Sequence, residues 1–421
     1  MPVRRTLLAA LALLLAVYVG QTLAGCAGAE PTPGPQAETA SDRALVLVSI
    51  DGFRWDYLDR GLDTPALDWV AEGARAERLV PVFPTKTFPN HYSLVTGLHP
   101  QDHGIVGNTM RDPERLVDGE PARFSLSNRQ AVADGRWWAG EPIWVTAERQ
   151  GVTAAPVFWP GSEAEIDGVR PSRWLPYDGA MPYAARADQA LDWLDEGAGF
   201  VTFYVEAVDN AGHRYGPDAP ETAAAIEEAD AALAHLLDGL RQRGRLDDTD
   251  IVVVSDHGMV PVSRDRVVLL DDAVDYETVD VDWGEVVGLW PDAGVDVEAL
   301  IARVSALPHL TAMRKADVPA RLHYSDHARV PPVVVLVDPG WTASSQRYLD
   351  RNPDRPSGGA HGYDNAEPGL HGILLARGPH LRTGALGPVS TVDVYNVLAG
   401  VLGVTPASNS GDPAVAARLL R

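Results

Sequence analysis

Five short polar segments of this chain each follow or adjoin an apolar run, and they carry residue types that bind metals. Together they hold three aspartates, three histidines and one threonine: Asp51, Thr87, Asp209, His213, Asp256, His257 and His361. Apolar strands that alternate with helices are typical of a parallel sheet that is buried on both faces. In such sheets, ligand sites lie beyond the carboxyl ends of the strands. The pattern therefore predicts an α/β domain with a ligand site at one edge of its sheet.

The hydrophobic periodicity predicts the strands and helices of this domain. The strand candidates are 44–50, 200–208, 250–255, 333–337 and 372–376. The helix candidates are 64–72, 90–97, 183–194, 221–243, 297–306 and 390–400. The stretch 265–329 lacks a metal-ligand pair, and we interpret it as an insertion or small subdomain. The end of the chain, 405–421, is interpreted as a surface tail.

Residues 1–25 have the pattern of a lipoprotein signal peptide. Arg4 and Arg5 precede an apolar run over 7–19, which is shorter than the roughly 20 residues of a membrane span. We expect cleavage before Cys26, acylation of that cysteine and a flexible tether over 26–41 that links the membrane to the domain 42–421. An uncleaved anchor or an ordinary secretory signal is the alternative. Ala27 after the cysteine favours the outer membrane, with the domain facing the periplasm.

Composition excludes some classes of function. The chain has 35 Lys and Arg against 58 Asp and Glu, a net charge of −23, which does not suit a long nucleic acid as partner. Cys26 is the only cysteine, so the exported domain forms no disulfide and carries no Cys-x-Pro-x-Arg sulfatase motif. We expect a monomer that its hydrophobic core alone stabilises.

The aspartates and histidines have spacings that suit metal ligands. Asp209 and His213 are four residues apart, so a helical turn or tight loop brings both to one ion, although an ordinary polar turn has the same spacing. Asp256 and His257 close an all-apolar strand, where a buried charge needs a partner. Mixed carboxylate and imidazole donors favour zinc over magnesium, and iron or manganese are alternatives. Two such ions can clamp the attacking and leaving oxygens of an in-line displacement.

Thr87 is the candidate nucleophile, because metal coordination can activate a hydroxyl that is otherwise unreactive. Pro89 then suits the first turn of a helix, whose free N–H groups favour a phosphoryl oxygen. Asn108 is a candidate donor to a non-bridging oxygen of that group. The alternatives are that Thr87 only caps the helix and that Asn108 only forms a turn. His91 and the remaining histidines are interpreted as structural, with a supporting role near the site open for His91 and His103.

These motifs resemble those of the nucleotide pyrophosphatase/phosphodiesterase family of the alkaline phosphatase superfamily, over about 44–404. The matching stretches are 84–97, 158–162, 209–217, 255–259 and 361–365. The resemblance implies a three-layer alkaline-phosphatase-like α/β fold, with a mostly parallel sheet, helices on both faces and a small inserted subdomain. It implies two Zn²⁺ ions, one bound by Asp209, His213 and His361, and the other by Asp51, Asp256, His257 and the Thr87 oxygen.

The same resemblance implies a phospho-threonyl intermediate on Thr87, phosphate binding by Asn108, and stacking of the nucleobase on Phe88, Tyr177 and Tyr204. Core or rim packing is the alternative for these aromatic residues. The expected activity is zinc-dependent hydrolysis of nucleotide phosphodiester and pyrophosphate bonds, as in ATP or dinucleotides, to nucleoside 5′-monophosphates. Alternatives are the same site acting on lysophospholipids, phosphonates or phosphomonoesters, and a non-catalytic lipoprotein that binds nucleotide or metal.

Overall fold

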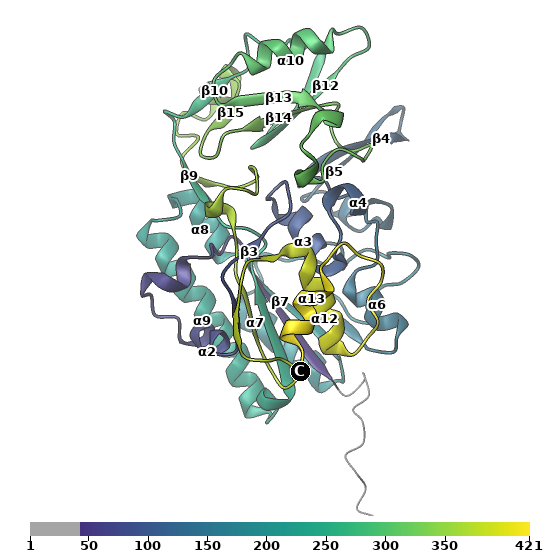
Figure 1. Ribbon diagram of the computed structural model, residues 1–421, viewed down its shortest axis with the longest axis vertical. Coiled ribbons are helices and arrows are strands. Elements are labelled where there is room, and N and C mark those ends of the chain that lie inside the picture. Colours follow the sequence, from purple (N-terminus) through teal and green to yellow (C-terminus); the bar gives the residue numbers. More distant parts are fainter. Residues whose placement is uncertain (1–42) are drawn as a thin grey trace, which may run out of the picture. The chain divides into compact units, whose positions relative to one another are not determined.

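The computed structural model describes residues 43–421, and its largest sheet has seven strands in the order β18-β2-β17-β8-β1-β7-β6 (Figure 1). The strands are β1 (Ala44–Ile50), β2 (Ala74–Ala76), β6 (Ala154–Val157), β7 (Phe200–Val205), β8 (Thr249–Val254), β17 (Leu374–Arg377) and β18 (Gly384–Leu386). The neighbours β8, β1, β7 and β6 are all parallel, and β17 runs antiparallel to β8 and β2. The predicted mostly parallel α/β sheet is therefore confirmed.

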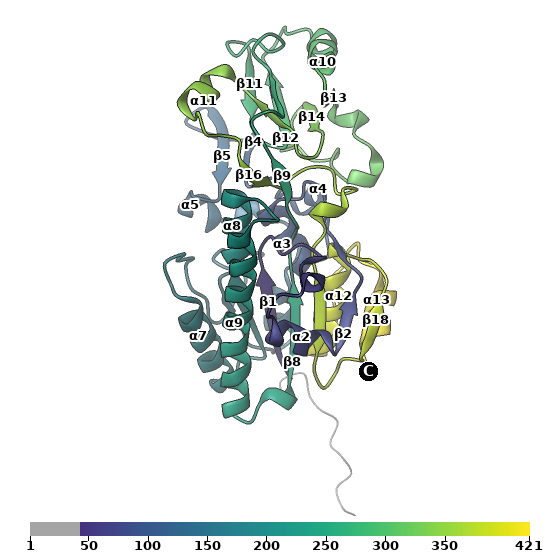
Figure 2. The same ribbon diagram turned by 90° about the vertical axis from the view of Figure 1, so that its left-hand side faces the viewer.

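Helices cover both faces of this sheet because its strands are apolar on both sides. In β1, Leu45 and Leu47 belong to one hydrophobic core, and Val46 and Val48 to another. Figure 2 shows the helices α7 and α9 on one side of the sheet and α12 and α13 on the other. The helices are α2 (Pro65–Ala71), α3 (Thr87–Thr96), α4 (Pro100–His103), α5 (Arg129–Val132), α6 (Ile143–Arg149), α7 (Tyr183–Asp195), α8 (Ala207–Tyr215), α9 (Pro220–Gln242), α10 (Val297–Ser305), α11 (Gln346–Arg351), α12 (Val394–Leu402) and α13 (Pro413–Leu419).

A smaller, four-stranded sheet lies between β8 and β17 in the chain. Its order is β11-β12-β14-β13, and all its neighbours are antiparallel. Its strands are β11 (Val279–Asp282), β12 (Val286–Pro291), β13 (Leu310–Arg314) and β14 (Val333–Val337), and α10 packs on β13. The expectation that 333–337 belongs to the main sheet is wrong. As an inner strand of the small sheet, β14 is apolar for the same reason as a buried parallel strand, and it carries this sheet beyond the expected limit at Arg329.

Paired short strands complete the fold. They are β3 (Leu79–Val80) with β19 (Val389–Ser390), β4 (Thr109–Val117) with β5 (Glu120–Ser125), β9 (Val260–Val262) with β16 (Gly358–Ala360), and β10 (Val267–Leu269) with β15 (Thr342–Ser344). The chain leaves the main sheet at Val254 and returns at Leu374, which is the residue paired with Val254 in the adjacent strand. Within 43–421, no helix is long and apolar enough to cross a membrane.

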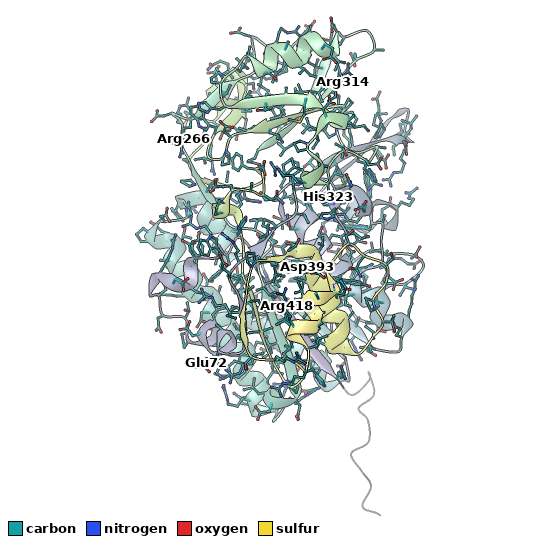
Figure 3. The ribbon with its side chains drawn as sticks, viewed as in Figure 1. Glu72, Arg266, Arg314, His323, Asp393 and Arg418 are labelled. Carbon is teal, nitrogen blue, oxygen red and sulfur yellow. The ribbon has the colours of Figure 1, made fainter. Side chains whose placement is uncertain are left out.

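Several contacts join the small sheet and its connections to the body around the main sheet, among them a ring stack and a buried ion pair. The ring of His323, labelled in Figure 3, stacks on His99 with centroids 3.8 Å apart. Arg329 Nε donates to Asp112 Oδ2 at 3.0 Å, and its guanidinium also reaches the carbonyl oxygen of Gly104.

The end of the chain is part of the core, contrary to the expectation of a surface tail. Val415, Ala416 and Leu419 are buried and belong to the same hydrophobic cluster as α12. Their spacing places them on one face of α13, so this helix buries an apolar stripe that is too short to stand out in the sequence.

Candidate active site

Three neighbouring parallel strands bring the predicted aspartates to one edge of the main sheet. Asp51 directly follows β1, and Asp256 follows β8 after one residue. Asp209 lies in the first turn of α8, which begins two residues after β7. Because β7, β1 and β8 are adjacent and parallel, their carboxyl ends lie together. The structure thus brings together the three aspartates as the sequence pattern predicts.

The first cluster of donor atoms combines α8 with the loop after β16. His213 Nε2 lies 3.1 Å from His361 Nε2 and 3.5 Å from Asp209 Oδ1. His361 Nε2 lies 3.7 Å from the same carboxylate oxygen. Ligands of a tetrahedral ion that is bound at about 2.0–2.1 Å lie about 3.3 Å from one another. The spacing of these three atoms therefore fits one small divalent cation.

The second cluster has the same spacing and includes the predicted nucleophile. His257 Nε2 lies 3.0 Å from Asp256 Oδ2 and 3.4 Å from Asp51 Oδ1. Thr87 Oγ1 lies 3.4 Å from the same nitrogen, at the N-terminus of α3. His257 also stacks on His361, with ring centroids 3.5 Å apart, so the two clusters adjoin. Thr87 is thus placed among potential metal ligands.

His213, His257 and His361 each direct the Nε2 atom toward these clusters. The Nδ1 atoms of His213, His257 and His361 lie 2.8–3.0 Å from backbone carbonyl oxygens, which can only accept a proton. Each Nδ1 therefore carries a proton and donates it, and in the neutral imidazole this leaves Nε2 with a lone pair. Two such lone pairs face each other at 3.1 Å between His213 and His361. A cation between them removes this repulsion.

The carboxylates also lack partners in the structure. One oxygen in each of Asp51, Asp209 and Asp256 is buried without a hydrogen bond. Burial and the nearby carboxylates of Asp256 and Asp209 raise the pKa of Asp51 well above its usual value. Burial, His257 and His213 hold the pKa of His361 well below its usual value, so its imidazole is neutral. Carboxyl oxygens without hydrogen bonds beside the neutral imidazole of His361 are a donor set that a bound cation would satisfy.

Further side chains hold the ligands in place. The Tyr204 hydroxyl donates to Asp51 Oδ2 at 2.6 Å. His91, which the sequence left as a structural histidine, is fully buried, and its Nδ1 lies 2.9 Å from Thr87 O and 3.3 Å from Asp256 Oδ2. Its Nε2 lies 2.8 Å from Ser49 Oγ. His91 therefore supports both the aspartate and the backbone of the predicted nucleophile.

A cavity of about 370 Å³ opens beside Thr87, within the usual size range of small-molecule sites. The predicted aromatic residues Phe88, Tyr177 and Tyr204 all line it. Sequence reasoning missed other lining residues, among them Phe158, Trp159, Glu163 and Glu206. Asn108 lies behind Phe88, whose N–H donates to Asn108 Oδ1 at 2.9 Å. This bond identifies the amide oxygen and leaves Asn108 Nδ2 as the group that can donate elsewhere.

One buried ion pair below the cavity was also missed. Arg186 is 1% exposed and binds both oxygens of Glu206, with Nη1 to Oε2 at 2.5 Å and Nη2 to Oε1 at 2.8 Å. Its Nη1 also donates to the carbonyl oxygen of Tyr204 at 2.9 Å. Arg186 therefore fixes the end of β7, with Tyr204, and Glu206, the residue that joins β7 to α8.

A family model described as type I phosphodiesterase / nucleotide pyrophosphatase matches residues 45–364. The chain belongs to this family. Human ectonucleotide pyrophosphatase/phosphodiesterase family member 5 is 34% identical over 87% of this chain and 76% of its own length. A bovine bis(5′-adenosyl)-triphosphatase is 34% identical over 95% of this chain and 85% of its own length.

A solved structure of this family has the same fold. An inactive threonine-to-alanine variant of murine member 5, in complex with AMP, superposes with a TM-score of 0.83 at 33% identity. The match covers 90% of this chain and all of that one. The predicted alkaline-phosphatase-like fold, the family and the enzyme class are thereby confirmed. The chain is a nucleotide pyrophosphatase/phosphodiesterase, a hydrolase with buried acidic and histidine groups that could hold metal.

Proposed function

We propose that this enzyme cleaves phosphodiester and pyrophosphate bonds of nucleotides, such as ATP and dinucleotides, and releases nucleoside 5′-monophosphates. One observation carries the proposal: Thr87 belongs both to the second donor cluster and to the wall of the aromatic cavity. A phosphoryl group at Thr87 would have a nucleoside-sized space on one side. The AMP complex of the murine relative and the name of the bovine triphosphatase support nucleotides as the substrate class.

We assign one Zn²⁺ to each donor cluster. The first ion would be held by Asp209, His213 and His361, and the second by Asp51, Asp256, His257 and the Thr87 oxygen. Mixed carboxylate and imidazole donors at this spacing suit zinc. When bound, the ions would supply Lewis-acid activation of the threonine oxygen and compensate the charge of the phosphoryl group.

The protein groups around Thr87 suit a displacement in two steps. Thr87 Oγ1 attacks the phosphorus, the bond from phosphorus to the leaving group breaks, and a phospho-threonine that carries the nucleoside remains. Water then attacks the same phosphorus and restores the hydroxyl. Asn108 Nδ2 would donate to a non-bridging oxygen, and the N-terminus of α3 adds free N–H groups. The inactive threonine-to-alanine variant of the murine relative supports a threonine nucleophile.

The aromatic wall would hold the nucleobase. Phe88 packs against Phe124 and Trp138 with ring centroids 5.9 and 6.1 Å apart, so its ring is braced. Tyr177 is 43% exposed and rests against Phe158 at 5.2 Å. We propose that these two rings stack on the base, while Tyr204 completes the wall and holds Asp51. Stacking of this kind tolerates every base.

Comparison of two chromogenic esters tests the proposal. The protein from Ala27 onward, loaded with zinc, should hydrolyse p-nitrophenyl thymidine 5′-monophosphate much faster than p-nitrophenyl phosphate, because only the diester fills the aromatic cavity. The measurement is kcat/KM for both substrates. A preference for the monoester would move the assignment to a phosphatase. Zinc binding without activity on either would point to a lipid or phosphonate substrate, or to a protein that only binds nucleotide.

We also propose that the enzyme is an exported monomeric lipoprotein, anchored through Cys26 in the outer membrane. Cys26, the signal peptide 1–25 and the tether 26–41 lie outside the described residues, so the proposal is supported by their sequence pattern alone. Cys26→Ser should abolish incorporation of labelled palmitate and release the active domain from the membrane fraction in a bacterial host. Continued labelling of the variant would contradict lipidation at this residue.

A further inference from the structure

A second, smaller cavity adjoins the loop that carries Thr87. Its volume is about 100 Å³, and Lys86, Asn108 and Trp283 are among the residues that line it. The larger cavity is lined by the next residues of the same loop, Thr87 and Phe88. Neighbouring residues of the loop that carries Thr87 therefore line both cavities, and the proposed reacting nucleotide occupies the larger one.

One wall of the second cavity comes from the small sheet, at the end of β11 and the turn 283–285 that joins β11 to β12. Lys86 Nζ lies 2.9 Å from Glu285 Oε2, so the residue before the nucleophile is paired to this turn. A Cβ atom on Gly284 would lie 2.8 Å from Lys86 Nζ, which shows how closely the backbone of the turn approaches the ammonium group. The turn thus contacts the nucleophile loop directly.

A second set of contacts fixes the other side of the same turn. Arg111, on the strand that follows Asn108, binds Asp280 and Asp282 at 2.7 Å each. Trp290 Nε1 donates to Asp282 Oδ2 at 2.6 Å. The turn is therefore held both to the loop of Thr87 and to the strand after Asn108. Residues carried on it have a defined position relative to the phosphoryl site.

Trp283 is the residue that this turn presents to solvent. Its side chain is 46% exposed, and the ring of Tyr276, which is 41% exposed, lies 6.0 Å away. An exposed indole on a fixed turn can stack on a planar ring with little loss of conformational entropy. Because it borders the cavity that contains Asn108, such a ring would belong to the leaving part of the substrate.

The charge of this region favours a leaving group that ends in a nucleoside. Two cations line the cavity, and both are already paired, Lys86 with Glu285 and Arg329 with Asp112. A pyrophosphate leaving group without a second nucleoside carries several negative charges. It would gain little electrostatic stabilisation in this cavity, because the cations there are already paired. The same phosphates capped by a second nucleoside carry less charge and offer an aromatic base.

We propose that Trp283 is a specificity-determining residue that stacks on the second base of dinucleoside polyphosphates; this rests on the proposed function. Thr87 Oγ1 attacks the phosphorus of the nucleotide in the larger cavity and gives its proton to solvent. The departing nucleotide takes the electron pair of the broken P–O bond, and Trp283 holds its base. Water then cleaves the phospho-threonine and returns a proton to the hydroxyl.

The test compares two substrates that share the reacting nucleotide. The full-length, zinc-loaded enzyme is assayed with diadenosine triphosphate and with ATP, and the ratio of their kcat/KM values is measured. Trp283→Ala should lower this ratio about tenfold, the usual size of one base–aromatic stack. Trp283→Phe, which retains an aromatic ring, should have a ratio close to that of the wild-type enzyme. Tyr348→Ala, a change at another exposed aromatic residue, on α11, should leave it unchanged.

An unchanged ratio in Trp283→Ala, or an equal fall in Tyr348→Ala, would overturn the inference while the proposed function stands. Failure of the wild-type enzyme to hydrolyse either substrate would overturn the proposed function and this inference with it. The two failures are therefore distinguishable in one set of assays.

Discussion

Replacement of Thr87 by alanine should lower kcat at least about a thousandfold, because the hydroxyl that attacks phosphorus is lost while the donor clusters and both cavities remain. The protein should still fold. Thr87 is the first residue of α3, and its side chain makes no capping bond there. The measurements are single-turnover hydrolysis of p-nitrophenyl thymidine 5′-monophosphate and a thermal melt of each protein.

Thr87→Ser is the matched control, because it keeps an oxygen at the same position. This variant should retain measurable turnover and form a labelled phospho-serine when the reaction is quenched early. A near-normal rate in Thr87→Ala would rule out the two-step mechanism, and attack by water on the nucleotide would then have to replace it.

Removal of metal should abolish activity and lower the melting temperature by about 10 °C, if zinc is present at about a thousand times its dissociation constant. The physical reason is that three aspartates, each with one buried oxygen that has no hydrogen bond, would be left beside one another. The experiment is dialysis against a chelator, followed by activity, melting and elemental analysis. Elemental analysis of the holoenzyme should find about two zinc ions per chain.

Addition of single metal ions to the chelated protein shows whether zinc or another ion supports activity. Zinc should restore both activity and melting temperature, whereas magnesium should not, since it prefers oxygen ligands and retains several waters. Full activity in protein that elemental analysis shows to be free of metal would contradict both assigned sites.

The sequence predicted best the features that local patterns determine. All residues of β1 and β8 are buried, and most of them are apolar. Asp51 follows β1 directly, and Asp256 follows β8 after one residue. Because adjacent parallel strands end at one edge, Asp51, Asp209 and Asp256 could be placed together before the structure was known. Helix ends were equally accessible, as in α9, where a long amphipathic pattern begins at a proline.

Strand partners and ion pairs between residues far apart in the chain could not be predicted from the sequence in the same way. The run Val333–Val337 reads alike as a central parallel strand or as an inner antiparallel one, and its partners β12 and β13 decide between them. Lys86 and Glu285 are 199 positions apart, and Arg186 and Glu206 are 20 apart. No local signal marks such pairs, because a charged residue that is buried by a distant partner looks like an exposed one in the sequence.

The direct pairing of Val254 with Leu374 has a consequence for how the sequence of this protein can evolve. The whole excursion that contains the small sheet starts and ends at neighbouring positions, so its length hardly affects the closure of the main sheet. Segments with adjoining ends are tolerant of insertion, shortening and exchange. New preferences for the departing half of a substrate can therefore be acquired by exchange of the part of the excursion beyond the paired residues Val262 and Gly358. Asp256, His257 and His361 lie outside that part and would keep their positions.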